Sequence, residues 1–139
     1  MLFVDDGSHD GSFEKVKELA QQDKRIRGIS FARNFGHQTA LLAGLQHAKG
    51  KAVISMDADL QHPPEVLPEL YHKWQEGFDI VNTRRLDVEG ASWFKKISSK
   101  YYYKFLNYLS DIPIEPAAAD FRLMNSKAVE AYILSLIHI

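Results

Sequence analysis

Cysteine is absent from this chain of 139 residues. Its absence excludes disulfide bonds, thiolate catalysis and zinc sites built from cysteine, and it is compatible with a cytosolic location. No apolar run reaches about 18 residues, the length that a membrane-spanning helix needs, so this chain is not expected to cross a bilayer. The net charge is −1, from 17 basic and 18 acidic residues, which gives no indication of a nucleic-acid partner.

Apolar residues make up 45% of the sequence, enough to form a hydrophobic core, and the length fits one domain. Short apolar segments alternate with segments whose apolar residues recur on one helical face. We expect strands at residues 2–4, 26–31, 52–56, 79–82 and 117–124, and helices at residues 13–22, 38–48, 64–76, 92–109 and from Ser126 onwards. Such alternation is typical of an α/β fold with a mostly parallel sheet and helices on both faces.

Two aspartates, Asp57 and Asp59, follow the expected strand at residues 52–56, which reads as a buried strand. Ligands of α/β sheets bind just beyond the carboxyl ends of the strands. Two carboxylates this close repel each other unless a cation lies between them, and a hard divalent ion that also binds phosphate oxygens meets that need. This strand end therefore indicates a metal and diphosphate site. The alternative is a solvated turn, in which aspartate is common.

The residues after this pair make the pattern more specific. From Asp57 the sequence runs DADLQHPPE, and Pro64 suits the first turn of a helix. This segment resembles the family 2 glycosyltransferases, and within them the dolichyl- and undecaprenyl-phosphate sugar transferases, which include dolichol-phosphate mannose synthase. The resemblance extends from Phe3 to about Tyr132. It implies a Rossmann-like, nucleotide-binding fold of the GT-A type.

The resemblance also implies roles for the residues of this motif. Asp57 and Asp59, helped by Gln61, would hold Mg²⁺ or Mn²⁺ on the diphosphate of a nucleotide sugar. Asp57 would then belong to the donor site, and Asp59 would act among the catalytic residues. The ion would neutralise charge that develops on the leaving group.

Asp5 and Asp6 stand at the end of the first expected strand, before Gly7. A carboxylate at such a strand end can accept hydrogen bonds from a base or a ribose. In the resembled family this turn binds the nucleotide. The alternative is capping of the following helix, for which Asp10 or Ser12 is also placed.

Arg33 lies before the N-terminus of the next expected helix, a natural anion site, and matches an arginine that lies near the donor in the resembled family. The alternative is a surface arginine beside a helix cap. Four histidines show no metal-ligand spacing among themselves and are expected at the surface: His37, His47, His62 and His72.

Asp120 and Arg122 belong to a segment that matches the family's Asp-Phe-Arg-Leu sequence near the acceptor. The resemblance implies that Asp120 is catalytic and that Arg122 and Arg85 bind phosphate, which arginine can contact with two donors. Because a lipid phosphate is already ionised, Asp120 is expected to orient the acceptor rather than to deprotonate it. The alternatives are a structural ion pair between Asp120 and Arg122 and a solvated basic pair at Arg84 and Arg85.

The expected helix at residues 92–109 carries an aromatic face beside a row of lysines at Lys96, Lys100 and Lys104. Lysines that border tryptophan and tyrosine are typical of a helix lying at a membrane interface. The alternative is a core helix with a solvated lysine row.

Both ends of the sequence read as interrupted. The strand at residues 2–4 has no strand before it, and the apolar run at residues 134–139 has no helix cap. Against the resembled family, a first strand and helix and a C-terminal membrane region are missing. We therefore expect residues 1–139 to form a single partial catalytic domain.

The function expected from the resemblance is metal-dependent, inverting transfer of a hexose from a UDP- or GDP-sugar to a polyprenyl phosphate. The reaction would take place at the cytoplasmic face of a membrane, in cell-envelope assembly, with this fragment itself soluble. No side chain pairs a covalent nucleophile with a base, which fits direct displacement. Transfer to a non-lipid acceptor, a nucleotide- and metal-binding fragment without turnover, a plain α/β interaction domain and homo-oligomer formation all stay open.

Overall fold

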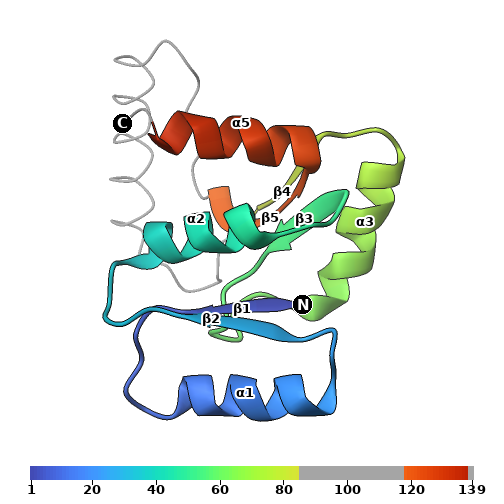
Figure 1. Ribbon diagram of the computed structural model, residues 1–139. Helices are drawn as coiled ribbons and strands as arrows, with labels where there is room; N and C mark the ends of the chain where they lie inside the picture. The colour runs from blue at the N-terminus through green and yellow to red at the C-terminus, as the bar shows by residue number, and fades with distance from the viewer. Residues whose placement is uncertain (85–117, 138–139) are drawn as a thin grey trace, which may run out of the picture.

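A computed structural model describes residues 1–84 and 118–137 of the chain (Figure 1). Arg85, the expected helix at residues 92–109 and its lysine row lie outside the described residues. The described strands are β1 (Leu2–Asp5), β2 (Arg27–Ser30), β3 (Ala52–Ser55), β4 (Ile80–Arg84) and β5 (Ala118–Asn125). The described helices are α1 (Ser12–Gln22), α2 (His37–His47), the short 3-10 helix η1 (Pro64–Val66), α3 (Leu67–Gln75) and α5 (Ser126–Ile137).

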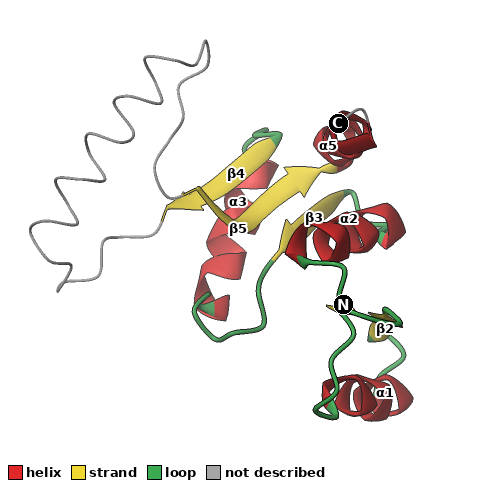
Figure 2. Ribbon diagram, turned by 90° about the vertical axis from the view of Figure 1, so that its left-hand side faces the viewer, coloured by secondary structure: helices red, strands yellow, loops and turns green. Residues whose placement is uncertain are grey.

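The strands form two hydrogen-bonded sheets. β1 pairs with β2 in parallel, with Leu2 opposite Arg27. The other sheet has the order β3–β5–β4, and β5 runs antiparallel to both of its neighbours (Figure 2). β3 and β4 therefore run in the same direction, as expected for strands joined by a crossover helix, here α3. The α/β class is confirmed, and the difference from the expected parallel pattern is that β5 enters between two parallel strands.

Helices cover both faces of the β3–β5–β4 sheet, because the side chains of β5 alternate between two cores. Phe121 and Leu123 point to one face, where they pack with Leu70 of α3. Met124 points to the other face, where it packs with Leu45 of α2 and with residues of α5. Figure 2 shows α3 on one side of this sheet and α2 and α5 on the other.

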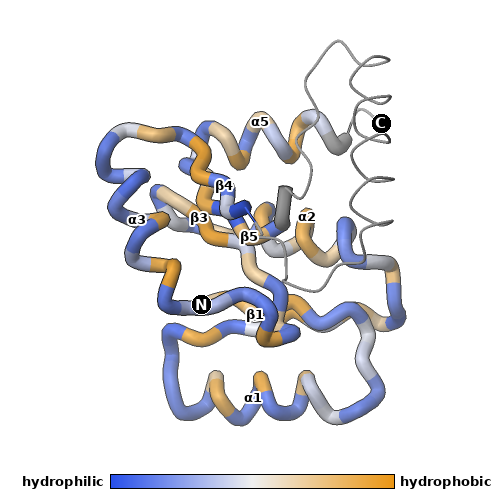
Figure 3. The backbone as a smooth tube through the Cα atoms, turned by 180° about the vertical axis from the view of Figure 1, so that it is seen from behind, coloured by the Kyte–Doolittle hydropathy of each residue, from blue (hydrophilic) through white to orange (hydrophobic). Residues whose placement is uncertain are grey.

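The β1–β2 pair lies between α1 and α2 (Figure 1). Gly28 of β2 allows α1 to approach closely, since a Cβ atom there would lie 2.8 Å from Val16 Cγ1. α2 contacts both sheets: a Cβ atom at Gly44 would lie 3.3 Å from Val4 on β1, while Leu45 is buried in the core beside β5. Figure 3 shows the apolar positions of α1 turned toward β1 and β2. α2 is thus the element that joins the two halves.

Between β1 and β3 lies a hollow of about 840 Å³ that both strands and α2 line. Among the described residues, β1 pairs only with β2, and β3 pairs only with β5. β1 and β3 therefore each have one edge to which no described strand is hydrogen-bonded. β3 is consequently half-buried along its length rather than fully buried, and Met56, expected in the buried strand, is 46% exposed. None of the described helices is long and apolar enough to cross a bilayer.

The turn after β1 depends on Gly7. Its φ of +73° lies in the left-handed region, and a Cβ atom there would stand 2.4 Å from the Arg33 carbonyl carbon. The turn after β1 and the loop before α2 therefore touch backbone to backbone, which only glycine permits.

This contact yields a stability prediction. Gly7→Ala should lower the free energy of unfolding by about 2–4 kcal/mol, from backbone strain plus the clash with the Arg33 backbone. Gly11→Ala is the matched control, since Gly11 has a similar φ of +83° but nothing within 4 Å of its Cβ position. The control should lose only about 1 kcal/mol. Urea unfolding measures both, and equal losses would show that the contact with Arg33 is unimportant.

Candidate functional site

The loop after β3 carries Asp57, Asp59 and Gln61. Asp57 is partly buried, whereas Asp59 is exposed and its Oδ1 accepts a hydrogen bond of 3.0 Å from the Gln61 backbone N–H. Leu60, between Asp59 and Gln61, has a φ of +63° and is 97% exposed. A left-handed, solvent-exposed leucine is unfavourable in two ways, and such strain is concentrated at functional loops.

His62 is buried, so the expectation that it lies at the surface is wrong. Its side chain is only 4% exposed, its ring stacks on Phe121 with centroids 4.9 Å apart, and its Nδ1 accepts the Asp57 backbone N–H at 3.2 Å. Since Nδ1 accepts, the ring proton is on Nε2, which has no hydrogen-bond partner among the described residues. His62 therefore anchors the backbone of Asp57 to the core. The clue in the sequence was its place between the aspartates and two prolines.

Asp120, near the start of β5, is held by three side chains. His37 Nε2 lies 2.9 Å from its Oδ2, the Arg122 guanidinium donates to its Oδ1, and the Ser55 hydroxyl donates to its backbone carbonyl. The carboxylate is thus fixed from α2 and from β5 itself. Both of its oxygens accept a hydrogen bond, which suits an orienting or electrostatic role better than that of a free base.

These contacts set the protonation of Asp120. Partial burial favours the neutral acid, but the hydrogen bonds and charges of His37 and Arg122 outweigh burial and hold the pKa of Asp120 below its ordinary value of 3.8. Asp120 is therefore ionised at neutral pH. An ionised carboxylate can only accept hydrogen bonds, so His37 carries its proton on Nε2.

Arg122 has its side chain 21% exposed and places its guanidinium 5.5 Å from the centre of the Tyr132 ring on α5. Its Nε is buried and has no hydrogen-bond partner among the described residues. The ion pair with Asp120 that was weighed as the structural alternative is present. Phosphate binding by Arg122 stays a prediction.

Asp5 and Asp6 both hold local structure. The buried Asp5 carboxylate accepts hydrogen bonds from the Ser8 N–H and from the Ser30 hydroxyl at 2.9 Å. Bonding to Ser8, opposed by burial and assisted by Ser30, lowers the pKa of Asp5. Asp6 accepts the N–H groups of Phe35 at 2.7 Å and Gly36 at 2.9 Å, and so fixes the loop before α2. Nucleotide binding by either residue stays a prediction.

Arg33 is exposed and its guanidinium lies 4.8 Å from the centre of the Phe35 ring. Asp10 accepts the Ser12 N–H at the start of α1, but the N-cap position is Gly11, which has no side-chain cap, so neither Asp10 nor Ser12 is the expected cap residue. His47 and His72 are exposed on helix surfaces, as expected.

The hollow beside β3 brings together side chains from four separate segments. Asp6 from the β1 turn, His37 from α2, Asp57 from the β3 loop and Asp120 from β5 all line it. His37 lies between two of the acids, since its Nδ1 is 3.8 Å from Asp57 Oδ1 while its Nε2 contacts Asp120. His37 was expected to be an ordinary surface residue; its side chain is 52% exposed but belongs to this site. Only its position directly before the expected helix at residues 38–48 hinted at that.

The donor set at the β3 loop fits a hard divalent cation. Carboxylate and amide oxygens, such as those of Asp57, Asp59 and Gln61, are the ligands that Mg²⁺ and Mn²⁺ prefer. The imidazole nitrogens nearest to the Asp57 carboxylate lie 3.8 Å and 4.0 Å away, beyond hydrogen-bond range, so neither satisfies that carboxylate. Within the described ranges, no three histidine or acidic side chains already cluster as metal ligands.

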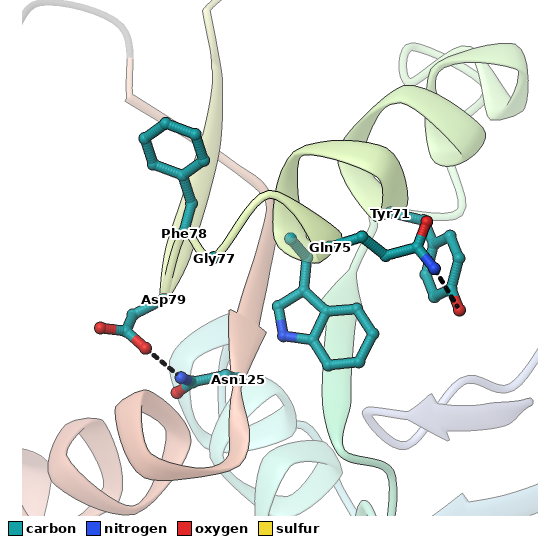
Figure 4. A pocket seen from close by; sticks show the side chains of 7 residues that line it. Tyr71, Gln75, Gly77, Phe78, Asp79 and Asn125 are labelled. Atoms are coloured by element: carbon teal, nitrogen blue, oxygen red, sulfur yellow. Dashed lines mark hydrogen bonds between the residues drawn. The ribbon is translucent and has the colours of Figure 1, made fainter.

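A second hollow, of about 520 Å³, opens beside Trp74 at the end of α3 (Figure 4). Tyr71, Phe78 and an Asp79–Asn125 hydrogen bond border it. Asn125 is the last residue of β5, whereas Asp120 is near its start, so this hollow lies at the other end of the strand. None of the predicted site residues lines it.

The lowered pKa of Asp120 yields a prediction for stability against pH. A carboxyl whose pKa is lower in the folded state stabilises the fold above its unfolded pKa, and the contribution is lost as pH falls through the folded value. Between about pH 5 and about pH 2, the unsubstituted chain should therefore lose more stability than Asp120→Asn, which cannot titrate there. Chemical unfolding at several pH values measures the difference, and parallel curves would contradict the assigned contacts.

Comparison with known proteins agrees with the resemblance seen in the sequence. The chain is 43% identical over 130 residues both to the uncharacterized glycosyltransferase YkcC of Bacillus subtilis (strain 168) and to the bactoprenol glucosyl transferase of Shigella phage SfV. It is 42% identical over 131 residues to the uncharacterized glycosyltransferase sll0501 of Synechocystis sp. (strain ATCC 27184 / PCC 6803 / Kazusa). These alignments cover 94% of the chain and from 40% to 42% of the relatives, so the chain spans about two fifths of their length.

The family description "Glycosyl transferase family 2" matches residues 1–133, which include all the described site residues. An α/β fold with acids gathered at the ends of its strands is consistent with that match. The chain belongs to glycosyl transferase family 2.

Proposed function

We propose that this chain is part of a metal-dependent, inverting glycosyltransferase that moves a hexose from a nucleotide sugar to a polyprenyl phosphate. The observation that carries the proposal is the approach of Asp57 and Asp120 to opposite nitrogens of one imidazole, beside a single hollow. A transferred sugar must touch both the donor diphosphate and the acceptor, so the residues for each must face one space.

Asp57, with Asp59 and Gln61, would hold Mg²⁺ or Mn²⁺ on the donor side. When bound, the ion would neutralise negative charge on the departing nucleoside diphosphate. His62 supports this side by fixing the Asp57 backbone, and Asp6 fixes the loop before α2 where a nucleotide would lie. The donor nucleotide in this proposal is UDP or GDP.

On the acceptor side, an oxygen of the lipid phosphate would form the new bond to the anomeric carbon. The bond from that carbon to the diphosphate would break, and the diphosphate would leave with the electron pair. An already ionised phosphate needs no base, in keeping with Asp120 having both oxygens engaged. Asp120 would orient the sugar or the acceptor, and Arg122 would offer charge to the phosphate.

A polyprenyl acceptor is favoured by the relatives named bactoprenol glucosyl transferase from Shigella phage SfV and Shigella flexneri. An acceptor of that kind would place the reaction at a membrane surface, for which we propose the cytoplasmic face. Transfer to a non-lipid acceptor and nucleotide binding without turnover are the competing functions. Product analysis with a polyprenyl phosphate and with free sugars as acceptors separates these.

The donor assignment is tested by Asp59→Ala and Asp57→Ala. Both should reduce Mn²⁺-dependent binding of UDP or GDP at least about tenfold, which is about 1.4 kcal/mol, because each removes a proposed ligand of the ion. Asp23→Ala is the control, an acid that pairs with Arg25 before β2. Calorimetry with and without Mn²⁺ measures these affinities. Unchanged affinity in both site variants would contradict the metal assignment.

The role of Asp120 is tested separately. Asp120→Asn keeps the size of the side chain but removes its charge, and should cut hexose transfer at least about tenfold while donor affinity stays within about twofold. Radiolabelled transfer assays and calorimetry give the two numbers. A parallel loss of donor affinity would move Asp120 from the acceptor side to the donor side.

A further inference from the structure

We infer that His37 is a positioning residue that orients the Asp120 carboxylate toward the space it shares with Asp57. The inference rests on the proposed function, in which Asp120 serves the acceptor side. It adds a residue from α2 to a site that otherwise consists of the β3 loop and β5.

The first argument is geometry. His37 Nε2 donates to Asp120 Oδ2 at 2.9 Å, across 83 positions of sequence. Arg122 holds the other oxygen, so the two donors together fix the plane of the carboxylate. Arg122 alone would leave the carboxylate free to rotate about its bond to that one donor. His37 supplies the second, independent restraint.

The second argument is that His37 is itself held in place. Asp6 accepts the N–H groups of Phe35 and Gly36, the two residues before His37. Gly36 has a φ of +93°, which turns the chain sharply into α2. The imidazole therefore projects from a fixed point at the start of a helix. A restraint is transmitted from Asp6 through this loop to Asp120, so the turn after β1 and the acceptor-side carboxylate are linked.

The third argument separates positioning from metal binding. His37 Nε2 is engaged with Asp120, and Nδ1 is 3.8 Å from Asp57, too far for a hydrogen bond. His37 therefore acts on Asp120 directly and on Asp57 only as a neighbour. Its removal should disturb the acceptor side while sparing the donor side.

The chain offers closely matched variants for the test. In His37→Gln, the amide nitrogen can occupy nearly the place of Nε2 and still donate to Asp120. In His37→Asn the side chain is shorter, so the donor falls short, and His37→Ala has none. His47→Ala is the control, because His47 lies on the same helix and its Nδ1 contacts the Ala43 carbonyl of that helix rather than an acid of the site. The half-exposed His37 side chain contributes little to the core, so all four variants should fold.

The first measurement is hexose transfer by the full chain with Mn²⁺, a UDP- or GDP-sugar and a polyprenyl phosphate. His37→Ala and His37→Asn should lower kcat about tenfold with the donor KM within about twofold, whereas His37→Gln should stay within about threefold of the unsubstituted chain. His47→Ala should be unchanged. An equal loss in His37→Gln and His37→Ala, or a loss that appears in donor KM, would overturn the inference.

The second measurement needs no turnover. Carboxyl carbon NMR can follow the titration of Asp120 in the metal-free chain, where its burial and its pairing with Arg122 persist. Loss of a hydrogen bond to the charged form should raise the pKa of Asp120 in His37→Ala and His37→Asn but not in His37→Gln or His47→Ala. An unchanged pKa in His37→Ala would overturn the inference. If the unsubstituted chain shows no transfer, turnover by this chain alone is ruled out, while this titration still decides the role of His37.

Discussion

The pairing of β5 with β3 and β4 is the constraint on which the rest of the structure depends. Phe121 and Leu123, on one face of this strand, complete the core under α3, and Met124 on the other face completes the core under α2 and α5. The same pairing sets Arg122 opposite Ser55. It thereby brings Asp120 beside the end of β3, although Asp120 and Asp57 are far apart in sequence. β5 thus contributes to both hydrophobic cores and also places Asp120 close to the loop that follows β3.

The positions of most described strands and helices could be predicted from the sequence. Periodicity located the described strands and helices closely, because their apolar faces pack against the cores that the periodicity predicts. The pairing partners were not readable, since alternation of strands and helices gives the direction of strands joined by a helix but not the neighbour of a strand such as β5. That Asp57 and Asp120 serve one reaction was implied only by the family resemblance, which gave them roles on the donor side and the acceptor side.

The roles of two histidines, His37 and His62, could not be predicted from the sequence. Spacing along the chain tests whether two histidines can share a metal, but it says nothing about a single ring that packs on Phe121 or bridges to Asp120. His62 and His37 acquire their roles through contacts with β5, a strand remote from both in sequence. The side chains of His47 and His72 lie within hydrogen-bond distance of groups four residues away along the chain, on Ala43 and Glu76, and for them the simple expectation of exposure was sufficient.

The open edges of β1 and β3 have a consequence for hydrogen exchange of the backbone amides. In a strand, successive N–H groups point to opposite edges, so half of those in β1 and β3 face a neighbouring strand and half face the hollow. Amide protons of the first kind are protected by hydrogen bonds, whereas those of the second kind lack a strand to pair with among the described residues. Deuterium uptake along both strands would then alternate from residue to residue, slow and fast. Each strand would then carry protected amide protons along one edge and rapidly exchanging amide protons along the other, at the place where the acids of the site meet.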